Sequence, residues 1–250
     1  MKNRAYKNYI FDFYGTLVDI LTDEKDPILW DKLAQLYQAY GADYKGEGLK
    51  KSYAKRVAQT RKELIEIKGV GYPEVDLAHI FNQLYVDGRS QSSYHNQPED
   101  WGQLIAMVFR VLSRKQLLAY PHTKEVLTFL KEQGCRLYLL SNAQAAFTNA
   151  EIDLMELRPY FDAIYLSSDV GICKPQPEFL KQVLDDHGLK PSETVMVGND
   201  LTTDIAVAEA VGIDGILLNT FPYSRRELEK SSIKPDRVIT DIEALKTNFT

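Results

Sequence analysis

The chain has few of the features that mark specialised classes of protein. Its 250 residues include two cysteines, Cys135 and Cys173, so we expect no disulfide framework and two reduced thiols packed as small apolar groups. No apolar run is long enough to span a bilayer, and Met1 to Arg4 lead into an expected strand rather than a signal peptide. The sequence therefore predicts a cytoplasmic protein that does not associate with membranes.

The chain also lacks a large excess of charge of either sign. The net charge is −5 and the lysines and arginines are scattered, so no nucleic-acid-binding surface is indicated. A hydrophobic content of 44% and a charged content of 26% are typical of a globular protein. A chain of 250 residues can form one large domain, or a core and a smaller cap.

The pattern of apolar residues along the chain changes near Tyr120. From about Pro27 to Tyr120 the pattern is helical throughout: apolar residues recur from Ile28 to Tyr37, and Gly41 stops that run. Three further amphipathic helices are expected over 49–68, 75–86 and 101–118, with a polar loop over 87–100. From Pro121 onward, helices alternate with short strands, which predicts a parallel α/β sheet.

Polar residues directly follow four short apolar runs. Asp12 follows the run 9–11, with Gly15 supplying the turn, and Ser141 and Asn142 follow the run 137–140. Lys174 follows the strand-like segment 163–166, and the run 194–197 leads into the segment 198–204. Because the carboxyl ends of parallel strands meet at one crevice, these side chains are expected to converge there.

In this order the four segments resemble the four motifs of the haloacid dehalogenase superfamily of hydrolases. Residues 12–16 are similar to its first motif, Ser141 to the second, Lys174 to the third and residues 198–204 to the fourth. The resemblance implies a doubly wound, Rossmann-like core over residues 1–19 and 119–250, with an all-α helical cap inserted over residues 20–118. In such enzymes the cap closes the crevice against water and carries substrate selectivity.

The resemblance also implies a role for each strand-end residue. Asp12 would be the nucleophile and a Mg²⁺ ligand, and the main-chain carbonyl of Tyr14 a second ligand. Lys174 would neutralise the nucleophile and the transferred group, while donors to phosphate oxygens would be Thr16, Ser141 and Asn142. The residues alone leave plainer alternatives open: a turn residue at Asp12, a helix cap at Ser141 and a surface cation at Lys174.

The acidic fourth motif can be aligned in two registers. Asn199 and Asp204 are five residues apart, whereas Asp200 and Asp204 are four apart and share one face of a starting helix. Because Mg²⁺ keeps several waters, one carboxylate and one amide oxygen would suffice as ligands. We expect Asn199 or Asp200 to be the direct metal ligand, and Asp204 to contact the residues around the metal without binding the metal itself. The alternative is that Asp200 and Asp204 are favourable charges at a helix N-terminus.

Tyr14 departs from the phosphatases of the superfamily, which usually carry a second Asp two residues after the nucleophile. A phenol with a pKa near 10 is poorly suited to protonate a leaving alcohol at neutral pH. Relatives that displace halide carry Tyr at this place, but they resemble one another in an early cap Arg, and no Arg occurs here between Arg4 and Arg56. They also act without metal.

Three functions therefore stay open. The sequence favours a Mg²⁺-dependent phosphatase of a small phosphorylated metabolite, acting through an aspartyl-phosphate on Asp12. The alternatives are a 2-haloacid dehalogenase-like hydrolase of carbon–halogen bonds and a catalytically weak binding protein of the same fold. Neither the substrate nor the oligomeric state can be inferred from the sequence.

Overall fold

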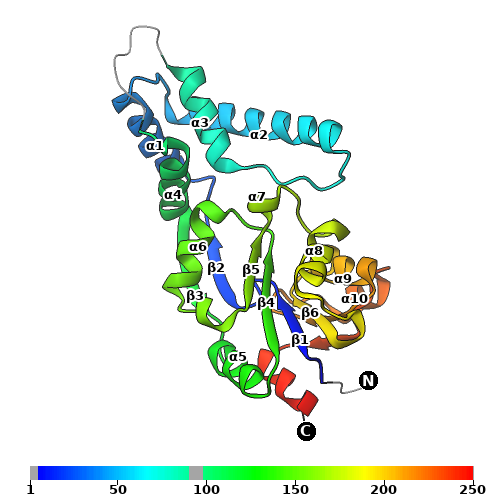
Figure 1. Ribbon diagram of the computed structural model, residues 1–250. Helices are drawn as coiled ribbons and strands as arrows, with labels where there is room; N and C mark the ends of the chain where they lie inside the picture. Colours follow the sequence, from blue (N-terminus) through cyan, green and yellow to red (C-terminus); the bar gives the residue numbers. More distant parts are fainter. Residues whose placement is uncertain (1–4, 90–97, 250) are drawn as a thin grey trace.

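The computed structural model describes residues 5–89 and 98–249. Within these residues a six-stranded sheet has the strand order β5-β4-β1-β6-β7-β8, and every neighbouring pair is parallel (Figure 1). The strands are β1 Asn8–Phe11, β4 Arg136–Ser141, β5 Ala163–Leu166, β6 Thr194–Gly198, β7 Asp214–Leu218 and β8 Arg237–Ile239. This arrangement confirms the predicted doubly wound α/β core, and β1, β4, β5 and β6 lie where apolar runs predicted strands.

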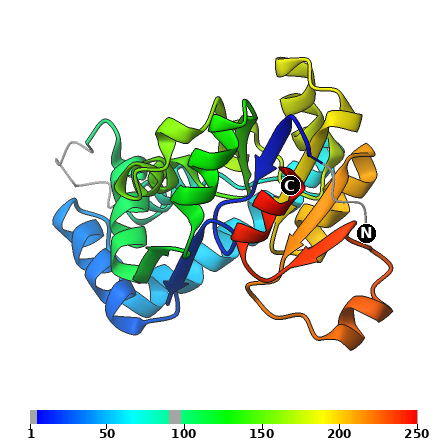
Figure 2. The same ribbon diagram turned by 90° about the horizontal axis from the view of Figure 1, so that it is seen from below.

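Helices cover both faces of this sheet because the side chains of each strand alternate between the faces. Tyr9 and Phe11 of β1 join the apolar cluster that includes α5 Thr123–Glu132, α6 Ala145–Leu154 and η4 Ile242–Phe249. Ile10 joins the cluster with α8 Pro177–His187 and α9 Ala206–Val211. The helix α5 and the C-terminal η4 pack against each other (Figures 1 and 2). The other core helices are η1 Arg158–Tyr160, α7 Ser167–Val170, η2 Pro191–Glu193, η3 Leu201–Ile205 and α10 Arg225–Lys230.

The helices that we call the cap lie together on one side of the sheet (Figure 1). They are α1 Pro27–Ala39, α2 Gly46–Lys68, α3 Leu77–Gly88 and α4 Trp101–Ser113. The cap has an apolar cluster of its own, rich in aromatic rings such as Tyr37, Phe81, Trp101 and Phe109. This cluster confirms the amphipathic patterns of the sequence. None of the helices within residues 5–89 and 98–249 is long and apolar enough to cross a membrane.

The prediction of a helix over 101–118 is wrong in its last part. The helix α4 ends at Ser113, and the next residues form the strand β3 Arg114–Ala119, which pairs antiparallel with β2 Val18–Thr22. Tertiary pairing with a distant segment overrides the local helical pattern here. The two-stranded β2–β3 ribbon joins the core to the cap.

The ribbon also bears on the expected domain limits. The division into residues 1–19 and 119–250 against residues 20–118 stays a prediction, and its limits fall inside the ribbon. Of the loop expected over 87–100, residues 87 and 88 belong to α3, and residues 90–97 lie outside the described residues.

Candidate active site

The sheet brings three of the predicted segments together at the carboxyl ends of its central strands. Asp12 follows β1, Ser141 ends β4, and Gly198 ends β6. Because β1 lies between β4 and β6 in the sheet, their ends are neighbours. The remaining segment, the third motif, reaches the same place because the loop that follows β5 and α7 brings Lys174 into contact with Asp12.

The carboxylate of Asp12 is held from two sides. Its Oδ1 accepts hydrogen bonds from Lys174 Nζ at 2.7 Å and from Ser141 Oγ at 3.0 Å. Its Oδ2 accepts one from Thr16 Oγ1 at 3.3 Å. Asp12 is 7% exposed, so the carboxylate is shielded but reachable, as a nucleophile must be.

Lys174 is buried in a group of acceptors, which excludes the surface-cation alternative. Its ammonium also donates to Asp204 Oδ1 at 2.7 Å and to the main-chain carbonyl of Leu140 at 2.8 Å, and the residue is 2% exposed. Burial by itself would lower the pKa of Lys174, but the contacts with Asp12 and Asp204 outweigh it and raise the pKa above its ordinary value. The ammonium therefore stays charged at neutral pH.

Asp204 is the second carboxylate in contact with the ammonium of Lys174. Its Oδ2 accepts the main-chain N–H of Asp200 at 3.0 Å, so both of its oxygens are engaged within the protein. Burial, with the nearby charge of Asp12, raises the pKa of Asp204 above its ordinary value against the opposing contact with Lys174. A side chain at Gly198 would overlap the Asp204 carboxylate, which explains the glycine at the end of β6.

The side-chain amide of Asn142 fixes the main chain of Lys174. Its Oδ1 accepts from Lys174 N at 2.7 Å, and its Nδ2 donates to Lys174 O at 2.9 Å. Asn142 therefore orients the loop that carries the lysine. Its predicted role as a donor to phosphate stays a prediction.

Thr16 and Asn199 connect the first and fourth motifs. Thr16 Oγ1 lies 3.3 Å from both Asp12 Oδ2 and Asn199 Oδ1, and its single proton satisfies one of these oxygens at a time. Gly15 allows this approach, because its φ is +79° and a Cβ there would collide with the Asn199 side chain. Two hard oxygens therefore face the same position.

The carboxylate of Asp200 has a different environment. Its Oδ1 accepts from Thr202 N at 2.6 Å and Thr203 N at 3.0 Å, so it caps the helical segment that follows. This geometry matches the helix-terminus alternative for Asp200 and brings Asn199, rather than Asp200, into contact with Thr16 beside Asp12.

The oxygen atoms at this site suit a hard cation that takes only a few of its ligands from the protein. Within residues 5–89 and 98–249, no group of three or more His, Cys, Asp or Glu side chains is arranged to hold a metal ion. Thr16 brings together the carboxylate of Asp12 and the side-chain amide oxygen of Asn199, whereas the main-chain carbonyl of Tyr14 stays a predicted ligand. Mg²⁺ accepts such a set, because it keeps several waters of its own.

The hydroxyl of Tyr14 belongs to a buried ionic cluster, where it is already hydrogen-bonded. It donates to Glu151 Oε2 and lies 3.0 Å from Thr148 Oγ1. Burial raises the pKa of Tyr14 far above its ordinary value, opposed by the Arg110 charge. The Arg110 guanidinium lies 5.0 Å from the centre of the Tyr14 ring. A phenol in this setting is a poor acid.

A pocket of about 370 Å³ lies between the core and the cap, beside this site. Tyr14, Asn142 and Gln144 contribute from the core, and the cap side includes Tyr53 and Val57 of α2. Four charged side chains that the sequence reasoning did not single out also line it: Glu24, Arg61, Glu74 and Arg110.

Only one of these four left a usable signal in the sequence. Arg110 occurs four residues after buried Ala106, on the apolar face of a predicted helix, which is an unusual place for an arginine. The others occur in polar stretches, where charged residues are ordinary.

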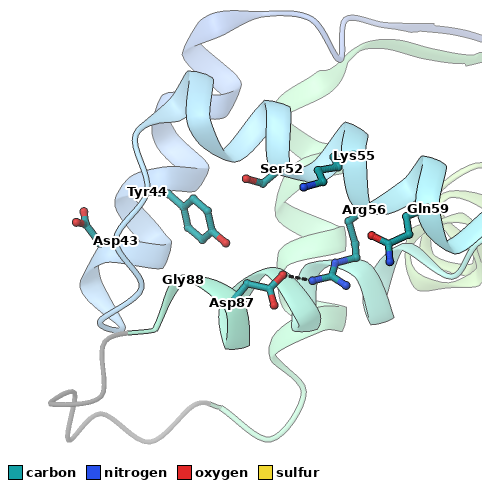
Figure 3. A pocket seen from close by; sticks show the side chains of 8 residues that line it. All are labelled: Asp43, Tyr44, Ser52, Lys55, Arg56, Gln59, Asp87 and Gly88. Carbon is teal, nitrogen blue, oxygen red and sulfur yellow. Dashed lines mark hydrogen bonds and ion pairs between the residues drawn. The ribbon is translucent and has the colours of Figure 1, made fainter.

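A second pocket, of about 450 Å³, lies wholly within the cap (Figure 3). Ser52, Lys55, Arg56 and Gln59 line it from one face of α2, and Arg56 forms an ion pair with Asp87 of α3. None of its lining residues belongs to the four motifs. We therefore place the chemistry at the strand ends.

Comparison with known proteins shows the family of the chain. A family profile for haloacid dehalogenase-like hydrolases matches residues 6–212, most of the chain. The chain belongs to this family, as the order of its four motifs predicted.

Curated relatives match over part of their length. A glyceraldehyde 3-phosphate phosphatase of Methanothermobacter thermautotrophicus is 33% identical over 132 residues, covering 52% of this chain and 58% of that protein. A ribulose-1,5-bisphosphate 5-phosphatase of Halopiger xanaduensis is 31% identical over 130 residues, covering 52% of each. The chain thus spans about half the length of the curated relatives it matches.

Solved structures match over nearly the whole chain. A 2-haloacid dehalogenase from Pseudomonas syringae superposes with a TM-score of 0.67 at 22% identity, covering 98% of both chains. At this identity the likeness shows a shared fold.

Proposed function

We propose that the protein is a Mg²⁺-dependent phosphatase that hydrolyses a small phosphorylated metabolite through an aspartyl-phosphate on Asp12. The observation that carries this proposal is the fixed carboxylate of Asp12, with Lys174 and Ser141 on one oxygen and Thr16 near the other. The phosphatase names of the partial relatives support the same reaction. The cytoplasmic location expected from the sequence stays part of this proposal.

The residues of the chain would divide the work of phosphoryl transfer. Asp12 forms a bond to phosphorus as the bond to the leaving oxygen breaks, and water then cleaves the acyl phosphate. Lys174 remains charged and stabilises the negative charge around the transferred group, with Ser141 and Thr16 as hydroxyl donors. Asp204 holds the lysine in place from behind.

A bound Mg²⁺ would supply charge neutralisation and orient the phosphoryl group. We assign its ligands to the Asp12 carboxylate, the Tyr14 carbonyl and the Asn199 amide oxygen. Asp200 stays an alternative ligand, because one of its oxygens caps the helix and the other is not committed by that cap. Asp204 is assigned to the residues that surround the metal ligands, because its two oxygens accept hydrogen bonds from Lys174 and from the main chain of Asp200.

The leaving group would occupy the pocket of about 370 Å³ between core and cap. Since the Tyr14 hydroxyl is committed to Glu151, no proton donor stands two residues after the nucleophile. The enzyme should therefore favour phosphates whose leaving groups need little protonation, such as aryl and acyl phosphates.

The test is a panel of aryl, acyl and alkyl phosphates assayed with Mg²⁺ and with a chelator. The proposal predicts phosphate release that requires Mg²⁺ and is faster for aryl and acyl than for alkyl esters. Failure of every phosphate in the panel would contradict it.

Tyr14 favours a second candidate, a hydrolase of carbon–halogen bonds, because halide leaves without a proton. Metal-independent halide release from 2-haloacids, measured on the same preparation, would support that candidate against the phosphatase. Absence of both activities would leave the binding protein of the same fold.

A further inference from the structure

A buried carboxylate in α6 joins the core to the cap. Glu151 Oε1 accepts from Arg110 Nε at 2.9 Å and from Arg114 Nη1 at 2.9 Å, and Oε2 accepts from Arg110 Nη2 at 3.2 Å. The Tyr14 hydroxyl also donates to Oε2. The Glu151 side chain is 3% exposed.

The partners of this carboxylate come from separate parts of the fold. Tyr14 lies in the turn after β1 that carries the nucleophile, Arg110 in the cap helix α4, and Arg114 at the start of β3 in the ribbon. One side chain thus contacts the catalytic turn, the cap and the connection between them.

The contacts are of the strong kind. A guanidinium that donates two hydrogen bonds to one carboxylate is fixed in orientation as well as in distance. Arg110 is further packed between two rings, with its guanidinium 5.0 Å from the centre of Tyr14 and 4.5 Å from that of Phe147. These three residues also line the pocket beside the site, so a shift of the cluster changes the pocket wall.

We propose that Glu151 is a positioning residue, which holds the Tyr14 turn and the cap in the arrangement that hydrolysis requires. Tyr14 then serves as the hydrogen-bond donor that connects the turn to Glu151, in the place where a phosphatase usually carries its proton donor. The role rests on the proposed function for its kinetic consequence, but the fixed position of the turn can be measured without any substrate.

The experiment compares Glu151→Gln, Tyr14→Phe and their combination with a matched control. Glu151→Gln keeps the shape but removes the charge, and Tyr14→Phe removes only the hydroxyl. The control is Asp153→Asn, which neutralises an exposed carboxylate on the same helix, where it pairs with Arg158 on the surface.

Two readouts are taken where every variant is folded. The first is kcat and KM for an aryl phosphate, and the second is amide hydrogen exchange over residues 13–18. We expect kcat to fall at least about tenfold in Glu151→Gln, since small misplacements of reacting groups are costly. The combined variant should be no slower than Glu151→Gln alone, because both changes weaken the same contact between residue 151 and Tyr14. Exchange over 13–18 should rise in Glu151→Gln and Tyr14→Phe but not in Asp153→Asn.

A lower melting temperature with kcat, KM and exchange unchanged would overturn the proposal, because it describes a residue that only stabilises the fold. If Glu151→Gln does not fold, Tyr14→Phe decides by the same criteria. If the parent hydrolyses no phosphate, the proposed function fails, and the exchange result alone then supports or overturns the positioning role.

Discussion

Replacing Lys174 by methionine separates the structural from the chemical role of the buried lysine. Methionine is similar in length but leaves Asp12 and Asp204, each 2.7 Å from the ammonium, without their shared counter-charge. Breaking a buried ion pair by removing one partner costs about 3–5 kcal/mol. For a chain of 250 residues this corresponds to a melting temperature lower by roughly 6–20 °C.

A second substitution should restore stability without restoring activity. In Lys174→Met combined with Asp204→Asn, one of the two uncompensated carboxylates is gone, so we expect about 1–3 kcal/mol of the lost stability to return. Turnover should stay at least about 10²-fold below the parent in both variants, since the charge facing the transferred group is absent. Urea unfolding and aryl-phosphate hydrolysis measure the two effects separately.

Either of two results would contradict this role of Lys174. A loss below about 1 kcal/mol in Lys174→Met would mean that the ammonium is not the buried counter-charge described here. A double variant as fast as the parent would mean that the lysine has no part in the chemistry.

Four further outcomes are expected. Asp12→Asn should fold as the parent does and abolish turnover; activity within about tenfold of the parent would remove Asp12 as nucleophile. Tyr14→Asp should raise the ratio of alkyl- to aryl-phosphate turnover, by up to about 10²–10⁴-fold, and an unchanged ratio would mean that another group is the acid. Gly198→Ala should lower the unfolding free energy by about 1–3 kcal/mol, because the methyl group overlaps Asp204, and urea unfolding with a change below about 0.5 kcal/mol would contradict this packing. Because the pKa of Lys174 is raised above 10.5, its stabilising contribution should be complete below that pH and should be lost only as the pH rises above it. A fall in the unfolding free energy that begins before the rising pH reaches about 10, and that is absent in Lys174→Met, would contradict the assignment.

The strand ends could be predicted because parallel-sheet geometry leaves little freedom. Once residues 9–11 and 137–140 are strands of one parallel sheet, Asp12 and Ser141 must emerge at the same edge. The order of the four motifs then predicted that Lys174 would join them, although no local pattern marks it as buried.

The ionic cluster and the ribbon could not be predicted from local patterns. The strand β3 reads as the continuation of α4, and only its pairing with β2, almost a hundred residues earlier in the chain, makes it extended. The contacts of Glu151 likewise join residues that are 37 to 137 positions apart. Such pairings depend on the fold as a whole, so the position of Tyr14 became clear only in three dimensions.

The central claim is that the reaction takes place at phosphorus and not at a carbon–halogen bond. Its most direct test is a single turnover in heavy-oxygen water, with excess enzyme and an aryl phosphate in the presence of Mg²⁺. Mass spectrometry then locates the label in the released phosphate or in the tryptic peptide 8–25, which contains Asp12. Attack of water on the phosphorus of an aspartyl-phosphate predicts label in the phosphate and none in the peptide. Label in Asp12 after turnover of a 2-haloacid, with no phosphate released from any ester, would contradict the account.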